Sequence, residues 1–184
     1  MDKRIAATTE KIYASFKTLL LKRNYNDIKI QEILDESGIA RSTFYAHYKT
    51  KEQLLNSICS TIMNHVFSHA LEEEKSHDFS KSSIFEYKHF ITHILYHIHD
   101  EKDLISAIFH SQCQSVFLDY LREALTPFAK VCMQNNFLPR KNVPEEIQTE
   151  VIIDAFITIV KYCVNQSFHI APEVLTEYFM SLNS

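Results

Sequence analysis

The chain of 184 residues contains a single glycine, Gly38, and only four prolines. A β-rich fold of this length would need many more of both residues for its turns. The shortage therefore predicts an all-α protein in which a few short connections join the helices. Hydrophobic residues make up 46% of the chain and charged residues 23%, a composition typical of a folded globular protein rather than a disordered one.

Apolar residues that recur at three- and four-residue steps predict about nine helices. The expected ranges are about 4–23, 28–36, 41–48, 51–74, 84–99, 102–111, 113–135, 144–168 and 172 onward. Thr50 and Gln53 are expected to form a capping box, in which the Thr50 hydroxyl accepts from the Gln53 amide and the Gln53 side chain reaches back to Thr50. Ser83 and Glu86 predict a second capping box. Pro127 is expected to bend its helix.

Charge is distributed unevenly along the chain. Residues 1–55 carry ten Lys and Arg against seven Asp and Glu, whereas residues 56–184 carry nine against sixteen. A basic head on an acidic body suits a head that approaches phosphate groups.

Neither a targeting segment nor a transmembrane span is expected. The N-terminal sequence lacks the apolar core of a signal peptide, and the most apolar run, residues 151–164, is shorter than the ~20 residues that span a bilayer. The four cysteines are scattered without a C-x-x-C pair, which predicts buried thiols rather than a metal site or a disulfide scaffold. We therefore expect a soluble cytoplasmic protein with no metal, no cofactor and no membrane association.

The position of the single glycine predicts a helix-turn-helix. Gly38 lies between two short predicted helices, and Ile39 follows it at the expected interface. Such a motif needs a tight turn between its helices, and only glycine takes a positive φ without steric cost. The alternative is an ordinary glycine that ends a helix.

The helix after Gly38 distinguishes these two alternatives. Phe44 is its one expected core anchor, whereas the other faces carry Arg41, Ser42, Thr43, Tyr45 and Tyr48. These side chains suit phosphate contact and base reading from a helix in the major groove. Lys51, in the first turn of the next helix, is expected to bind phosphate together with the helix amides.

The segment ILDESGIARSTFYAHYKTKEQLL, residues 33–55, resembles the DNA-binding signature of the tetracycline-repressor (TetR) family. The resemblance covers about residues 4–60. The positions that carry it are Gly38, Ile39, Thr43, Phe44, Tyr45, His47, Tyr48, Lys51 and Leu54. It implies a three-helix DNA-binding head over residues 1–50 and a helical body for effector binding and dimerisation over residues 51–184.

The resemblance also implies which residues contact DNA. The implied contacts are Gln31, Arg41, Ser42, Thr43, Tyr45, His47, Tyr48 and Lys51. Lys29 is predicted to add a phosphate contact. Lys29 and Ala40 depart from the family pattern, which often places a capping hydroxyl at both positions. Asp27 is expected to cap the first helix of the motif instead, and Ala40 is expected to lower DNA affinity slightly.

The last two helices are predicted to form a dimer interface. Apolar residues cover more than one face of the helix at 144–168, so that helix must be buried on more than one side. The resemblance implies a four-helix interface between two chains. The predicted interface residues are Val151, Ile152, Ala155, Phe156, Ile159, Tyr162, Leu175, Tyr178 and Phe179. An alternative is a plain core helix within one chain.

Ten histidines raise the question of an effector or metal site. His89, His93 and His97 fall opposite the apolar stripe of their helix, which predicts a solvated or inter-helix face rather than a metal site. Other histidines lie on or beside an apolar stripe, where a polar group needs a partner. The predicted pocket for an unknown small-molecule effector is bordered by Cys59, His65, His69 and His110, although core histidines with satisfied hydrogen bonds are the alternative.

These features predict a homodimeric repressor that binds a palindromic operator in double-stranded DNA and is released by an effector. One alternative is a TetR-like activator or co-regulator whose body binds a protein partner. A more remote alternative is a helical metal-dependent enzyme, suggested by Glu74-x-x-His77 and Glu86-x-x-His89. The further glutamates that such an enzyme needs are not evident, so we expect no enzymatic activity.

Overall fold

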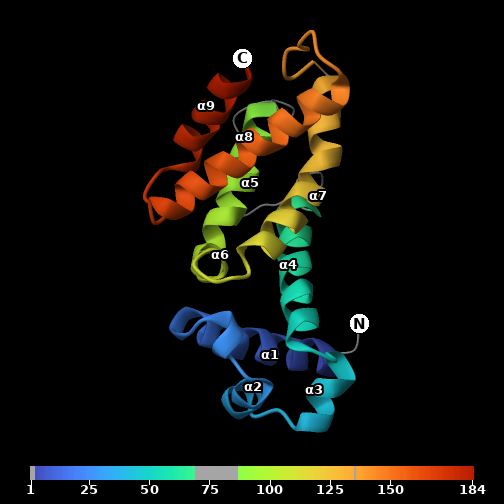
Figure 1. The fold of residues 1–184 in the computed structure, drawn as a ribbon, viewed down its shortest axis with the longest axis vertical. Coiled ribbons are helices and arrows are strands. Elements are labelled where there is room, and N and C mark those ends of the chain that lie inside the picture. Colours follow the sequence, from blue (N-terminus) through green and yellow to red (C-terminus); the bar gives the residue numbers. More distant parts are fainter. Residues whose placement is uncertain (1–2, 69–86, 135) are drawn as a thin grey trace. The chain divides into compact units, whose positions relative to one another are not determined.

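The computed structural model describes residues 3–68, 87–134 and 136–184. Within these ranges it contains nine α-helices, one short 3-10 helix and no strand (Figure 1). The elements are α1 (Lys3–Lys22), η1 (Tyr25–Asp27), α2 (Ile30–Ser37), α3 (Arg41–His47), α4 (Lys51–Ser68), α5 (Tyr87–Asp100), α6 (Lys102–Phe109), α7 (Gln114–Gln134), α8 (Glu145–Asn165) and α9 (Pro172–Asn183). The predicted all-α fold is confirmed.

Packing divides the chain into two compact units, and the first comprises Met1–Thr61 together with Asp103–Phe117. Its fully buried side chains include Phe16 of α1, Ile33 of α2 and Phe44 of α3. Helix α1 packs against α2. The first unit therefore holds the whole predicted helix-turn-helix, together with α6, which is remote from it in sequence. The functional boundary between residues 50 and 51 remains a prediction.

The second unit comprises Ile62–Lys102 and Leu118–Ser184. Within it, α9 packs against both α5 and α8. Phe156 of α8 and Phe179 of α9 meet edge to face, with ring centroids 5.7 Å apart. The hydroxyls of Thr92 in α5 and Thr176 in α9 form a buried hydrogen bond of 2.8 Å. Apolar contact and a satisfied polar pair thus hold α9 on its neighbours.

The predicted capping box at the start of α4 is half correct. The Gln53 amide donates to the Thr50 hydroxyl at 3.1 Å, as predicted. The Gln53 side-chain oxygen instead accepts from the amide of Lys49, at 2.7 Å. The Gln53 side chain therefore accepts from the residue before Thr50, one position earlier than expected. The predicted box at Ser83 and Glu86 lies outside the described residues.

Pro127 lies inside α7.

In the described part of the chain, no helix is both long and apolar enough to cross a membrane. All four cysteines are buried, as their scattered positions predicted.

Candidate DNA-binding interface

A left-handed turn at Gly38 joins α2 to α3. Gly38 has φ 65° and ψ 20°, and its amide donates to the carbonyl of Leu34 at 2.9 Å, which ends α2. A Cβ placed on Gly38 would meet no atom within 4 Å. The requirement for glycine is therefore one of backbone conformation, because side-chain-bearing residues enter this region only at a cost.

Helix α3 combines one buried anchor with exposed polar side chains. Phe44 is fully buried, whereas Arg41, Ser42 and Tyr45 are exposed and Thr43 is half-buried. Because a seven-residue helix held by one aromatic side chain leaves its remaining faces open, α3 can offer a guanidinium, hydroxyls and a phenol to a groove.

An aromatic ring supports the exposed arginine of α3. The Arg41 guanidinium carbon lies 5.9 Å from the centroid of the Tyr45 ring, within the range of a cation–π contact. His47, at the last position of α3, is half-buried. The Arg41 guanidinium and the Tyr45 ring are thus neighbours on the exposed surface of α3.

Tyr48 was predicted to contact DNA, and this prediction is corrected. Only 8% of Tyr48 is exposed, and its ring packs against Phe44 at 5.9 Å and Tyr13 at 6.4 Å between centroids. Burial raises the pKa of its hydroxyl to about 12. Tyr48 therefore holds α3 against α1. This role could not be predicted from the residue type, because tyrosine suits both a core and a phosphate contact.

Lys51, predicted to bind phosphate, has its contacts within the protein. Its ammonium donates to the carbonyls of Tyr25, at 2.5 Å, and Ile28, at 2.7 Å. It also lies 4.1 Å from the centroid of the Tyr25 ring. Burial lowers the pKa of this ammonium. The first partners of the Lys51 charge are thus groups of the protein itself.

The start of α2 is capped by Glu32 rather than by Asp27, so the expectation for Asp27 is wrong. The Lys29 amide donates to the Glu32 carboxylate at 2.8 Å, and this hydrogen bond lowers the pKa of Glu32. The side chains of Lys29 and Gln31 are both exposed. The Gln31 amide nitrogen donates to Asp35 at 2.8 Å. Both predicted DNA contacts therefore lie on the surface of the first unit.

Two further tyrosines, Tyr13 and Tyr25, belong to this motif and were not predicted from the sequence. The Tyr13 hydroxyl lies 2.5 Å from the Ser57 hydroxyl of α4, and the buried Tyr25 packs edge to face on Phe16 at 6.2 Å. Tyr25 stands in a polar segment, Asn24 to Asp27, that resembles a simple helix end. No hydrophobic periodicity in the sequence identifies Tyr25 as a buried residue.

The residues predicted to border an effector pocket are not brought into one site. Cys59 is fully buried in the first unit, where burial raises its thiol pKa to about 12. His110 is exposed and lines an open hollow of about 410 Å³ with the end of α1, from Leu20 to Asn24. His65 belongs to the second unit, and His69 lies outside the described residues.

Three histidines of the second unit lie against one another. His97 is 2% exposed, and its Nε2 lies 2.9 Å from Nε2 of His93. The His65 ring of α4 meets the His97 ring edge to face at 4.7 Å. The expected inter-helix face is thus present, but a solvated face is wrong for His97. Among the described residues, no three potential ligands are placed to hold a metal ion.

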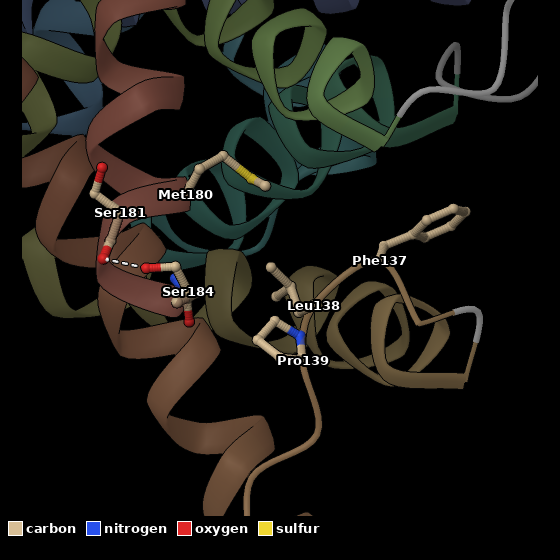
Figure 2. Close-up of a pocket in the computed structure, with 7 residues that line it drawn as sticks. Phe137, Leu138, Pro139, Met180, Ser181 and Ser184 are labelled. Atoms are coloured by element: carbon tan, nitrogen blue, oxygen red, sulfur yellow. Dashed lines mark hydrogen bonds between the residues drawn. The ribbon is translucent and has the colours of Figure 1, made fainter.

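A second open hollow, of about 440 Å³, lies where the segment after α7 meets the end of α9. Figure 2 shows Leu138 and Pro139 facing Met180 and Ser184 across it. None of the predicted effector residues lines this hollow.

The nine predicted interface residues differ in their exposure. Five of them are buried within their own chain and cannot form a surface for a second one, which corrects the prediction for Ile152, Phe156, Ile159, Leu175 and Phe179. Ala155 is half-buried. The exposed members are Val151, Tyr162 and Tyr178. Further exposed apolar residues of these two helices are Ile147, Val174 and Leu182.

A short helix that buries one aromatic anchor, exposes polar side chains and follows a glycine turn is the DNA-reading element of a helix-turn-helix protein. Residues 7–58 match the family of bacterial regulatory proteins named tetR. Residues 85–184 match the C-terminal region of a class of transcriptional regulators. The chain therefore belongs to the TetR family of transcriptional regulators, a family of DNA-binding regulators rather than enzymes.

Individual relatives agree with this assignment. The chain is 37% identical over 71 residues to the uncharacterized HTH-type transcriptional regulator YxbF of Bacillus subtilis (strain 168), which covers 36% of the chain and 19% of the relative. The chain spans less than a fifth of the length of the curated relatives it matches.

Solved structures extend the likeness of fold to the whole chain. A TetR transcriptional regulator from Streptococcus agalactiae 2603V has a TM-score of 0.75 at 24% identity, covering 100% of this chain and 97% of that one. The dihydroxyacetone kinase operon activator DhaS has a TM-score of 0.60 at 16% identity, covering 95% of this chain and 93% of that one.

Proposed function

We propose that the chain is a homodimeric transcriptional repressor that binds a palindromic operator in double-stranded DNA. A small-molecule effector bound in residues 51–184 would release it, and the protein would act in the cytoplasm. The observation that carries the DNA-binding part is the surface of α3, where Arg41, Ser42 and Tyr45 are exposed around the buried Phe44.

The exposed side chains divide into two roles. Arg41 is the side chain of α3 best suited to read a base, because a guanidinium can donate two hydrogen bonds to the edge of a guanine. Lys29, Gln31 and Tyr45 are suited to phosphate contacts, which supply affinity and orientation but no sequence information. Ser42 and Thr43 add hydroxyls that serve either role.

Dimerisation is supported by the exposed apolar side chains of the last two helices. Val151 of α8 is 55% exposed, and Tyr178 of α9 is 45% exposed. The Tyr162 and Tyr178 rings lie 6.3 Å apart, so exposed aromatic side chains of the two helices meet at the surface. A second copy would bury this surface in a two-fold interface. Two heads would then fit half-sites about 34–36 Å apart.

Release by an effector would be a shift of population. An effector that binds better to one arrangement of the two heads favours that arrangement by its difference in affinity. Activation is the second possibility for the sign of regulation, because the similar structure DhaS is described as an operon activator. A reporter gene placed behind the operator distinguishes the two: deletion of the regulator raises expression for a repressor and lowers it for an activator.

The test is selection of bound sequences from a random library of duplex DNA, repeated at low and high salt. We expect an enriched palindrome whose binding weakens steeply as salt rises, because phosphate contacts release counterions. Phe44→Ala, which removes the anchor of α3, serves as the inactive control. Binding without enrichment of any sequence would contradict a sequence-specific regulator.

A further inference from the structure

The ammonium of Lys51 contacts groups of the turn that precedes α2. It donates to the carbonyls of Tyr25 and Ile28, at 2.5 and 2.7 Å, and lies 4.1 Å from the centroid of the Tyr25 ring. A lysine ammonium has three donors. Two of them are used on these carbonyls, and the face of the buried Tyr25 ring covers the same charge.

The two carbonyls have a particular place in the motif. Tyr25 belongs to η1, and Ile28 stands directly before Lys29, the residue that precedes α2. Ile28 is 2% exposed, and its amide donates to the carbonyl of Tyr25 at 3.1 Å. The acceptors therefore belong to one hydrogen-bonded turn with a buried side chain. This turn therefore presents its two carbonyls to Lys51 at defined positions.

The contact joins the two ends of the reading element. Helix α2 precedes α3 in the chain, and α4, which begins at Lys51, follows it. A link between the start of α4 and the turn before α2 closes this segment into a loop. Gly38 connects α3 to α2, and residues 48–50 connect α3 to α4. The link therefore limits how far α3 can rotate relative to these two helices.

We propose that Lys51 is a positioning residue, whose ammonium clamps the turn at Tyr25 and Ile28 to α4 and so fixes the angle at which α3 meets the groove. This inference rests on the proposed DNA-binding function and concerns how the reading helix is held. A direct contact between Lys51 and phosphate is the competing role.

The two roles differ in what DNA binding loses when the ammonium is removed. A lost phosphate contact weakens binding to every sequence alike and reduces the slope of log K against log salt by roughly 0.9. A lost clamp lowers the fraction of molecules in which α3 is correctly placed, which weakens specific binding. Nonspecific binding, which needs charge rather than register, changes little.

The experiment compares Lys51→Met with Lys49→Met in the full chain, on the selected operator and on unrelated DNA. Lys49 is exposed and two residues earlier, so its variant removes the same charge without touching the clamp. We expect Lys51→Met to lower the ratio of specific to nonspecific affinity on the order of tenfold, as befits charge-assisted hydrogen bonds. Lys49→Met should leave that ratio unchanged. An unchanged ratio in Lys51→Met, with equal weakening on both DNAs, would overturn the inference.

Tyr25 supplies a second pair of variants that no phosphate contact can explain. Tyr25→Phe keeps the aromatic face and Tyr25→Leu removes it, and Tyr25 is itself buried. We expect Tyr25→Phe to retain the specificity ratio and Tyr25→Leu to lower it. Circular dichroism at the assay temperature confirms that each variant is folded. Equal specificity for the folded Tyr25→Leu and Tyr25→Phe proteins contradicts a role of the ring in the clamp, because both variants keep the two carbonyl acceptors.

The clamp is also visible without DNA, which separates it from the proposed function. In protein labelled with carbon-13 lysine, the ε-methylene protons of Lys51 should be shifted upfield by the Tyr25 ring, unlike those of Lys49. The shift should disappear in Tyr25→Leu. If wild-type protein selects no sequence, the proposed function fails while this shift still tests the clamp. Absence of the shift overturns the inference whatever the DNA result.

Discussion

Replacing Gly38 by alanine is expected to lower the free energy of unfolding by about 1 kcal/mol, for a reason that the structure isolates. The residue has φ 65°, where a residue with a Cβ is disfavoured by roughly 1–2 kcal/mol. A Cβ there meets nothing within 4 Å, so no steric clash adds to this cost. Alanine also restricts the unfolded chain, which offsets up to about 1 kcal/mol.

Urea unfolding followed by circular dichroism measures this difference. For a chain of this size, a loss of about 1 kcal/mol corresponds to a fall in Tm of roughly 2–4 °C. Gly38→Asn is the matched variant, because asparagine enters the left-handed region more readily than alanine. We expect stability in the order glycine, asparagine, alanine. A Gly38→Ala protein more stable than wild type would refute the conformational argument, and a loss far above 2 kcal/mol would mean a clash that the structure lacks.

Three further predictions concern DNA reading, dimerisation and the thiols. Arg41→Ala should reduce discrimination at the base it reads by about 1–3 kcal/mol, measured by repeating the library selection; uniform weakening on all sequences would contradict its role. Val151→Glu or Tyr178→Glu, which place a charge on the exposed apolar surface of α8 and α9, should shift sedimentation toward the monomer, whereas Lys130→Glu should not; a dimer that survives both changes refutes this surface. Burial raises the thiol pKa of Cys59 to about 12, so Cys59 should resist Ellman's reagent until the protein unfolds. The free energy of unfolding should fall as pH rises above 9.0, because the folded state disfavours the thiolate. Rapid reaction of Cys59 in the native protein would contradict its burial.

The fold could be predicted from the sequence because its strongest signals are local. One glycine among regular helical periods restricts the chain to helices, and the turn at Gly38 requires a conformation that few other residues adopt. Phe44 is the one large apolar side chain among polar ones in α3, so its burial follows from the pattern. These inferences need no knowledge of what lies far away in the chain.

The roles that could not be predicted depend on distant partners. Tyr48 and Tyr45 are the same residue type three positions apart, yet only Tyr48 meets Tyr13 of α1 and is buried. Lys51 has its acceptors more than twenty residues earlier, at Tyr25 and Ile28. Side-chain chemistry limits what each residue can bind, and the tertiary fold selects among those possibilities.

The predicted dimer interface is limited in the same way, because the tertiary fold decides which residues of α8 are covered. Apolar content along α8 correctly indicates a helix buried on several sides, but it does not say which neighbour covers which side. Ile152 and Phe156 are covered by their own chain, whereas Val151 is left exposed. Adjacent residues on one helix thus differ in role because they differ by about 100° in direction.

The inclusion of Asp103–Phe117 in the first unit has a consequence for the order in which the protein is made. Asn26 donates a hydrogen bond to Gln112, and Cys113 is buried within that unit. When only the first 61 residues have been synthesised, the first unit therefore still lacks residues 103–117. The full set of contacts of the first unit can therefore form only after residue 117 of 184 has left the exit tunnel.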